Sequence, residues 1–299
     1  MNRLNYEKVF KTLVEETGNY LVNHSLRAMV LGVSGGIDST VVAAICCEVN
    51  KQTNIPLIGR SLPIKNKKDE FDVSTLVGEA FCNNFDVANL YDEYKYFLSG
   101  LVWREERIDL LDNTETMHPE KSKQQTLIAN GNIQARLRMI YLYNLASIHN
   151  GLVMSTDNQT EYQLGFWTIH GDVGDFDPIQ DLWKTEVYQL AEWLKLFYYT
   201  DGDDADKAVA IGESIKLTPT DGLGISNSDL DQIGAKSYND VDRVLQTLVC
   251  PASLENDRVQ DALTVEIGPE IIDKIIKRRS NSRFKREKSP IYISRERYE

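Results

Sequence analysis

Apolar and polar positions alternate along the first ninety residues in a pattern that predicts strands followed by helices. Short apolar runs typical of buried strands lie at residues 28–33, 55–59 and 85–90. Apolar residues at helical spacing lie before and between these runs, at residues 4–23, from 37 to about 49, and 73–81. This order predicts an α/β fold with a doubly wound, mainly parallel sheet and helices on both faces. In such sheets ligands bind at the carboxyl ends of the strands.

The second half of the chain continues the pattern more loosely. Its predicted elements are a long helix with an apolar stripe at 131–150, a buried strand at 151–156 and a helix at 182–197. The polar residues 91–126 are expected to form a helix and a mobile loop, and residues 198–226 to be rich in loops. Arg136 and Arg138 lie beside the apolar stripe, which indicates a site, a subunit interface or a solvated helix edge.

The turn after the first predicted strand carries the clearest chemical signal. It reads Ser34-Gly35-Gly36-Ile37-Asp38-Ser39 and leads into a helix. Unpaired backbone N–H groups at a helix start attract anions, and glycines let a phosphate approach them. The common phosphate loop has a lysine after its glycines, whereas this turn has the acid Asp38, which suits a Mg²⁺ ligand beside phosphates. The alternative is a tight turn with a capping aspartate.

A second polar cluster follows the predicted strand at 151–156. Thr156 and Glu161 lie at its carboxyl end, so we expect them to face the same crevice as Asp38. Glu161 is predicted to give magnesium a second carboxylate, because two carboxylates and phosphate oxygens suffice for that ion. Lys184 lies in the first turn of a later helix, where a positive charge is unfavourable because of the helix dipole. This placement is tolerable if Lys184 faces a phosphate.

Charge and composition argue against several classes of protein. The formal net charge of -12 disfavours general nucleic-acid binding, which needs a basic face. The four cysteines form no C-x-x-C pair and no zinc spacing, and Cys46 and Cys47 are expected to be small apolar fillers. With no signal core and no run near the ~18–20 apolar residues of a membrane span, we expect a cytoplasmic protein without membrane contact. The basic tail at 274–288 is either a solvated helix end or a clamp for a charged ligand.

Taken with its apolar strand, the turn resembles the pyrophosphate loop of the N-type ATP pyrophosphatases. An ordered set of further motifs, from Gly32 to about Arg286, narrows this to a resemblance to the NAD synthetase family. The motifs are G-N-I-Q-A-R-L-R-M at 131–139, T-D-N with its following glutamate at 156–161, G-F-W-T at 165–168, G-D at 171–172, the run at 178–184, P-T at 219–220 and F-K-R at 284–286. The resemblance implies an adenine nucleotide alpha-hydrolase-like, Rossmann-like fold.

The resemblance also implies a ligase that forms a carbon–nitrogen bond. In that family ATP adenylates the carboxylate of deamido-NAD (nicotinate adenine dinucleotide), and ammonia displaces AMP to give NAD, with release of pyrophosphate. ATP and Mg²⁺ are therefore the implied cofactors. Two other classes stay open: another ATP pyrophosphatase that amidates or thiolates a different substrate, and a non-catalytic ATP-binding module.

Matched motif by motif, the resemblance implies roles for individual residues. Those implied to contact ATP are Gly32, Val33, Ser34, Gly35, Gly36, Ile37, Asp38, Ser39, Thr156, Lys184 and Thr220. Those implied to contact deamido-NAD are Arg136, Asp175, Phe284 and Lys285. The implied magnesium ligands are Asp38 and Glu161, and the implied catalytic residues are Asp38, Lys184 and Asp175. The acids Asp172 and Asp175 are candidates for assisting the incoming ammonia.

Some positions depart from the family pattern, and they concern the substrate more than ATP. Ile169 stands where a lysine is common, Ser61 where an arginine is common, and Phe284 where a histidine is common. The segment after Gly171 is shorter by one residue, so Asp175 matches only when counted back from the following proline.

Chain length bears on the nitrogen donor. About thirty residues precede Gly32, which is too few for the amidase domain of the glutamine-dependent members. We therefore expect a single domain over residues 1–299, no N-terminal glutaminase domain, and the use of ammonia. The resemblance implies a homodimer with the dinucleotide bound across the interface, and the helical residues 133–148 are the candidate interface.

Overall fold

The computed structural model describes residues 4–100, 119–200, 204–219, 229–249 and 263–287. Within these residues four parallel strands form one sheet in the order β3-β2-β1-β4. The strands are β1 (Met29–Gly32), β2 (Leu57–Ser61), β3 (Asn84–Val87) and β4 (Leu152–Val153). Met29 of β1 pairs with Leu57 on one side and with Leu152 on the other. An isolated parallel bridge between Met154 and Phe176 follows β4.

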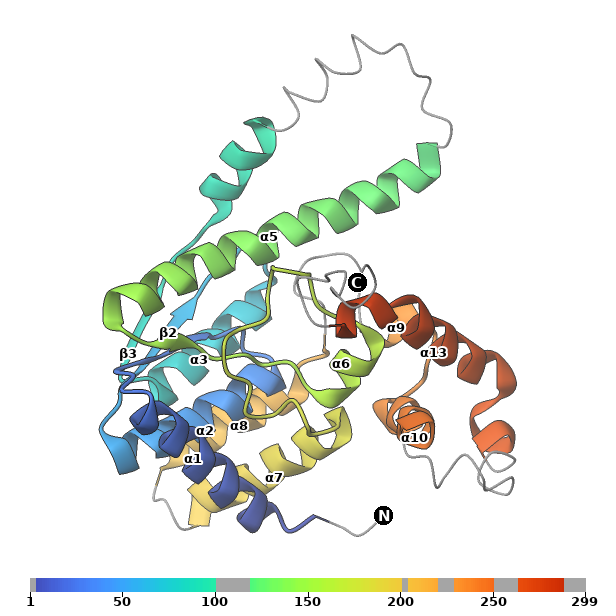
Figure 1. The fold of residues 1–299 in the computed structure, drawn as a ribbon. Coiled ribbons are helices and arrows are strands. Elements are labelled where there is room, and N and C mark those ends of the chain that lie inside the picture. The colour runs from blue at the N-terminus through green and yellow to red at the C-terminus, as the bar shows by residue number, and fades with distance from the viewer. Residues whose placement is uncertain (1–3, 101–118, 201–203, 220–228, 250–262, 288–299) are drawn as a thin grey trace, which may run out of the picture.

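Helices cover both faces of the sheet, because successive side chains of a strand point to opposite faces. Met29 and Leu31 of β1 pack in an apolar core with α1 (Tyr6–Asn23), α2 (Ile37–Thr53), α3 (Lys68–Phe81), α7 (Lys184–Thr200) and α8 (Ala205–Lys216). Val30 points the other way, into a core with α5 (Pro119–His149) and the helical residues 91–100. Figure 1 shows α5 across one face of the sheet and α1, α2, α7 and α8 on the other side of it. The predicted doubly wound, parallel α/β fold is confirmed.

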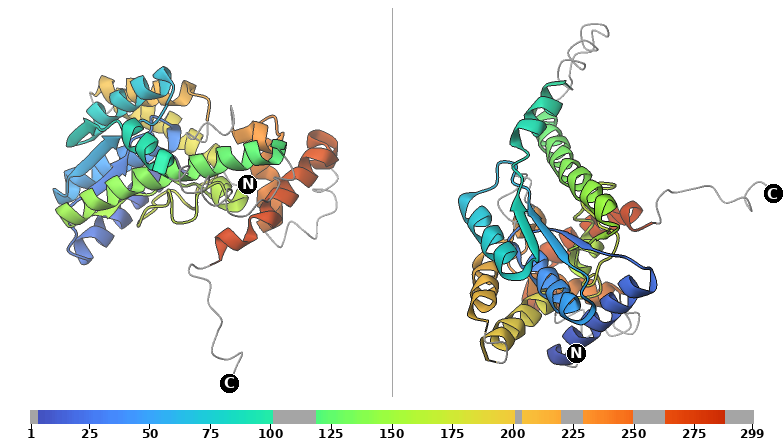
Figure 2. Two further views of the ribbon diagram at one scale, coloured as in Figure 1. Left: turned by 90° about the horizontal axis from the view of Figure 1, so that it is seen from above. Right: turned by 90° about the vertical axis from the view of Figure 1, so that its left-hand side faces the viewer.

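A third apolar cluster lies beside the sheet and gathers helices from the second half of the chain (Figure 2). It joins α6 (Gln159–Leu164), α9 (Asp229–Ile233), α10 (Tyr238–Val249) and α13 (Pro269–Asn281), and the 3-10 helix η1 (Arg283–Arg286) follows α13. Leu164, Leu245 and Ile275 are buried within it. The cluster also takes in Trp183, the residue before α7, so it borders the start of that helix.

Three sequence predictions of element boundaries were wrong. Helix α8 lies inside residues 198–226, which we expected to be rich in loops. Most side chains on its buried face, such as those of Ala208, Ala210 and Ser214, are small and give a weak apolar signal. Helix α5 begins at Pro119 and not near residue 131, so part of the predicted mobile loop is helical. Helix α3 begins at Lys68, before the predicted start at residue 73, where its acidic first turn complements the helix dipole.

The cysteines of the described residues behave as the sequence predicts. Cys46 is buried in the core, and Cys47 and Cys82 pack against it as free thiols. Burial raises the pKa of the Cys82 thiol to about 12, so it stays protonated and unreactive. Among the described helices, none combines the length and apolar character needed to cross a membrane. The expected cytoplasmic location stays a prediction.

The strand order positions the site. From β1 the chain steps outward through β2 to β3, and it then returns to add β4 on the other side of β1. The loops that leave β1 and β4 therefore diverge and open a crevice between them at the carboxyl edge of the sheet. This is the point at which doubly wound sheets bind ligands.

Candidate active site

The turn between β1 and α2 needs glycine at one position in particular. Gly35 has a φ of +81°, and a Cβ there would lie 2.7 Å from the backbone nitrogen of Ser74 and 2.9 Å from the carbonyl oxygen of Glu70, both on α3. Gly36 is the N-cap of α2 with a φ of -66° and offers no side-chain cap. The first N–H groups of α2 are therefore not capped from within the helix, and they point to the crevice where an anion can bind.

Hydroxyl groups hold this turn in place from two sides. Ser34 Oγ accepts a hydrogen bond from the N–H of Gly36 and shares another with Ser39 Oγ at 2.9 Å. From α8, Ser214 Oγ lies 2.6 Å from the carbonyl oxygen of Gly35 and 2.6 Å from Thr40 Oγ1. The loop is thus preformed by contacts from α2, α3 and α8.

Three charged side chains converge beside the turn. The ammonium group of Lys184, at the start of α7, lies 2.5 Å from Asp38 Oδ2 and 3.1 Å from Glu161 Oε1. Asn158, the N-cap of α6, donates from Nδ2 to Asp38 Oδ1 at 2.8 Å. Asp38 comes from α2 and Glu161 from α6, so three helices meet here. The prediction that the two polar clusters face one crevice is confirmed.

The electrostatics of Lys184 follow from its position. The lysine is only 2% exposed, and burial by itself would lower its pKa. The nearby carboxylates of Asp38 and Glu161 outweigh burial and hold the pKa of Lys184 well above its usual value. Lys184 is therefore a permanent buried cation, balanced by two acids that can also bind a metal.

Further acids line the segment behind these three side chains. Burial raises the pKa of Asp157 well above its usual value, and it raises the pKa of Asp177 to about 7. The pKa of Asp172 is also raised by burial, although the backbone N–H of Thr168 donates to its carboxylate at 2.7 Å. These three aspartates consequently carry less negative charge at neutral pH than three fully ionised carboxylates would.

Two adjoining cavities flank the turn. One, of about 190 Å³, surrounds Asp38, Glu161 and Lys184. The other, of about 260 Å³, lies between the ends of β1 and β2 and helices α3 and α5. The residues that line both are Ser34, Asn66, Glu70 and Thr156. A ligand with a ring system in the larger cavity could therefore extend phosphates into the smaller one.

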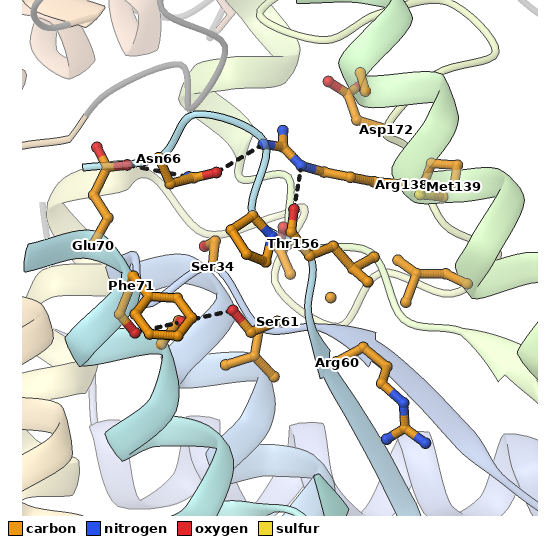
Figure 3. Close-up of a pocket in the computed structure, with 17 residues that line it drawn as sticks. Ser34, Arg60, Ser61, Asn66, Glu70, Phe71, Arg138, Met139, Thr156 and Asp172 are labelled. Carbon is orange, nitrogen blue, oxygen red and sulfur yellow. Dashed lines mark hydrogen bonds between the residues drawn. The ribbon is translucent and has the colours of Figure 1, made fainter. Parts of the chain in front are cut away.

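A chain of hydrogen bonds borders the larger cavity (Figure 3). Arg138 of α5 donates from Nε to the carbonyl oxygen of Leu62 at 3.0 Å and from Nη2 to Asn66 Oδ1 at 3.1 Å. Asn66 in turn donates to Glu70 Oε2 at 3.1 Å. Burial lowers the pKa of Arg138 to about 10, which still leaves it charged at neutral pH.

Asn66 and Glu70 were not among the predicted site residues, and Arg138 was named only together with Arg136, as an indication of a site, a subunit interface or a solvated helix edge. Asn66 and Glu70 follow β2 at its carboxyl end, and that position was an available signal. For the arginines, the sequence did not indicate which of the two faces the cavity. The resemblance assigned Arg136, whose side chain is exposed and donates to the carbonyl oxygen of Ile169 at 3.0 Å.

The other predicted substrate residues lie apart from Lys184. Asp175 accepts hydrogen bonds from the Tyr143 hydroxyl at 3.2 Å and from the N–H of Val153 at 3.0 Å, and it lines neither cavity. Lys285 donates to the carbonyl oxygen of Gly165 at 2.8 Å and to that of Trp167, while the ring of its neighbour, Phe284, is 52% exposed. Thr220 lies outside the described residues.

The donor set at Lys184 suits magnesium bound together with phosphates. Asp38 and Glu161 offer two carboxylates, and within the described ranges no group of three or more acids, histidines or cysteines could hold a metal by itself. Magnesium commonly takes one or two carboxylates and completes its shell with phosphate oxygens and water. The residues present fit that arrangement, in which substrate supplies the missing ligands.

The fold and the site define an α/β protein with a glycine turn and a buried lysine–carboxylate cluster at the strand switch point. A model of the NAD synthase family matches residues 9–289, and the chain therefore belongs to this family. It is 29% identical to an NH3-dependent NAD(+) synthetase of Wolinella succinogenes over 97% of both chains.

Two solved structures share the fold. They are an NMN synthetase from Francisella tularensis (TM-score 0.70, 22% identity, 98% of this chain and 100% of that one) and an NH3-dependent NAD synthetase from Campylobacter jejuni (TM-score 0.65, 22% identity, 97% and 100%). At this identity the likeness concerns the fold alone.

Replacing Gly35 with alanine is expected to destabilise the protein. The left-handed conformation costs a non-glycine residue about 1–2 kcal/mol, and the new Cβ would press on the backbone of α3. The melting temperature of Gly35→Ala should fall accordingly. Gly36→Ala is the matched control, because its φ is negative and the nearest atom, Ser34 Oγ, lies 3.3 Å from the added Cβ. Equal melting temperatures for the two variants would contradict this account of the turn.

Proposed function

We propose that this protein amidates deamido-NAD to NAD, using ATP and ammonia and releasing AMP and pyrophosphate. The observation that carries the proposal is the juxtaposition of the Ser34–Ser39 turn with the buried Asp38–Lys184–Glu161 group. Membership of the NAD synthase family and similarity to an NH3-dependent enzyme support the reaction and the nitrogen donor. Adenylation converts a poor leaving oxygen of the carboxylate into AMP, which ammonia can displace.

ATP would bind with its phosphates at the start of α2. The backbone of residues 32–39, Thr156 and Lys184 would contact it, and Thr220 is a further predicted contact. Asp38 and Glu161 would hold magnesium, which when bound neutralises phosphate charge. As the phosphates arrive, the Lys184 ammonium would exchange a carboxylate partner for a phosphate oxygen and stabilise charge that develops on the departing pyrophosphate.

The proposed substrate contacts follow the family pattern. Arg136, Asp175, Phe284 and Lys285 are the residues that the family pattern assigns to deamido-NAD. Of these, Lys285 lies next to Trp167, whose ring centroid is 5.5 Å from its Nζ, and a nicotinate ring with its carboxylate would suit such a pair. Asp172 and Asp175 stay candidates for assisting ammonia, and the raised pKa of Asp172 is compatible with exchanging a proton.

The test of the reaction is NAD formation by the purified protein with ATP, Mg²⁺, deamido-NAD and ammonium, run beside glutamine. We expect product with ammonium, and far less with glutamine. Because an NMN synthetase shares the fold, nicotinate mononucleotide is assayed in parallel. Asp38→Asn should lower the rate of pyrophosphate release more than about 100-fold. Mutating a residue that only hydrogen-bonds to a metal ligand already lowers activity by roughly 10–100-fold.

Glu48→Gln, on the same helix as Asp38, is the control and should retain activity within about twofold, because it contacts Tyr198 and Lys51 away from the crevice. Pyrophosphate release by Asp38→Asn at the wild-type rate would remove Asp38 from the site. No amide product from either nicotinate substrate would favour a different carboxylate substrate or an ATP-binding module.

We also infer a homodimer that forms through α5. Large apolar side chains are exposed along this helix, namely Leu127, Ile128, Ile140, Tyr143 and Ile148. Ile140 and Ile148, each 67% exposed, are two helical turns apart and so lie on one side of it. Exposed large apolar side chains on one helix, with Ile140 and Ile148 on one side of it, favour a subunit interface there.

Light scattering after size exclusion is expected to give twice the mass of one chain. Ile140→Asp should raise the dimer dissociation constant at least about tenfold, since it places a charge in an apolar interface. Leu196→Asp, at an exposed leucine of α7, is the matched control and should stay dimeric. A monomeric wild-type protein, or an Ile140→Asp variant as dimeric as the control, would argue against this interface.

A further inference from the structure

The start of α7 is capped by side chains from two other helices. The N–H of Lys184 donates to Thr160 Oγ1 at 2.9 Å, and the N–H of Thr185 donates to Asp242 Oδ2 at 2.9 Å. Helix N–H groups of the first turn have no partner within the helix, and the residue before the helix normally supplies one. Here that residue is Trp183, whose side chain has no acceptor. The position of Lys184 therefore depends on Thr160 of α6 and Asp242 of α10.

Thr160 and Asp242 also bind each other. The Thr160 hydroxyl donates to Asp242 Oδ1 at 2.5 Å, and both side chains are almost fully buried, at 1% and 2% exposure. Thr160 precedes Glu161 in the chain, and it accepts from the backbone of Lys184. One carboxylate on α10 thus connects to both residues that flank the predicted metal and phosphate position.

Packing alone does not require an acid at this position. Leu164, Val241 and Leu245 already bury α6 and α10 against each other in the third apolar cluster. A carboxylate buried in such surroundings is unfavourable unless hydrogen bonds compensate for its lost hydration. The hydrogen bonds that Asp242 accepts from Thr160 and Thr185 provide this compensation. One helical turn earlier, the ring of Tyr238 lies 5.5 Å from Lys184 Nζ. Helix α10 therefore contacts the side chain of Lys184 through Tyr238, and Asp242 reaches its backbone through Thr160 and the neighbouring N–H of Thr185.

We propose that Asp242 is a positioning residue for the reaction, which acts through Thr160 to fix the places of Lys184 and Glu161. The inference rests on the proposed function, because it concerns how the ATP site is held. In this proposal α10 and the helices packed against it do more than bury apolar surface, because they hold the residues of the ATP site in position. A displacement of Lys184 by even about 1 Å would be expected to slow the reaction strongly.

The experiment compares Asp242→Ala, Thr160→Val and Thr160→Ser with the wild-type protein. Melting temperatures are measured first, and kcat and KM for NAD formation are then measured well below the lowest of them. Thr160→Val keeps the shape and loses the hydroxyl, whereas Thr160→Ser keeps the hydroxyl. We expect Asp242→Ala and Thr160→Val to lower kcat roughly 10–100-fold, with KM for deamido-NAD little changed and Thr160→Ser close to wild type.

Asp240→Asn is the matched control on the same helix. Its carboxylate accepts a hydrogen bond from Ser237 Oγ at 2.9 Å, at the start of its own helix, so the kcat of the variant should stay within about twofold of wild type. The double variant Thr160→Val with Asp242→Ala should lose no more than the worse single variant, because both act through one connection.

A lower melting temperature with wild-type kcat in Asp242→Ala and Thr160→Val would overturn the inference and leave Asp242 a structural residue. Losses that multiply in the double variant would overturn it as well. If Asp242→Ala does not fold, Thr160→Val and Thr160→Ser carry the test. If the wild-type protein forms no NAD, the proposed function fails, and calorimetric ATP affinity decides the inference: weaker binding by Thr160→Val but not by Thr160→Ser supports it, and equal binding refutes it.

Discussion

The ammonium group of Lys184 lies buried between two carboxylates that come from different helices, and the arrangement of the crevice depends on this contact. A buried charge without partners is strongly unfavourable, and removing one member of a buried pair typically costs about 3–5 kcal/mol. The charged lysine can stay buried away from water only if Asp38 and Glu161 remain beside it. The same two acids can bind a metal only if something else takes their place beside the lysine. Incoming phosphates meet both requirements, so the contact that stabilises the free protein also prepares the site for its ligand.

The backbone brings these groups together through two constraints. The strand order places the ends of β1 and β4 on either side of the switch point, so the segments that follow them border one crevice. Gly35 then lets the turn pass within contact of α3 in a conformation that other residues avoid. Side chains from α6 and α10 cap α7 and fix its first residue, Lys184. Each constraint is local, yet together they set the distances at the site.

The sequence was sufficient to predict the parallel α/β fold and the meeting of Asp38 and Glu161, while the family resemblance pointed to Lys184. Both follow from local rules, namely apolar runs, the glycine turn and the convergence of strand ends. It was not sufficient to predict α8, whose buried face consists mostly of small residues. It also did not indicate Asp242, which is 82 residues from Thr160 and reads as one more acid on an amphipathic helix. The choice between Arg136 and Arg138 likewise depends on how α5 is rotated against the sheet, which helical periodicity alone does not determine to one residue.

The most direct test of this account is the affinity of the protein for ATP with Mg²⁺, measured by titration calorimetry for the wild type and Lys184→Gln. Lys195→Gln, at an exposed lysine of the same helix, serves as control. If the crevice at Lys184 holds the phosphates, a folded Lys184→Gln protein binds ATP at least about tenfold more weakly, and the control binds as the wild type does. Wild-type affinity in a folded Lys184→Gln protein would contradict the account and place ATP elsewhere.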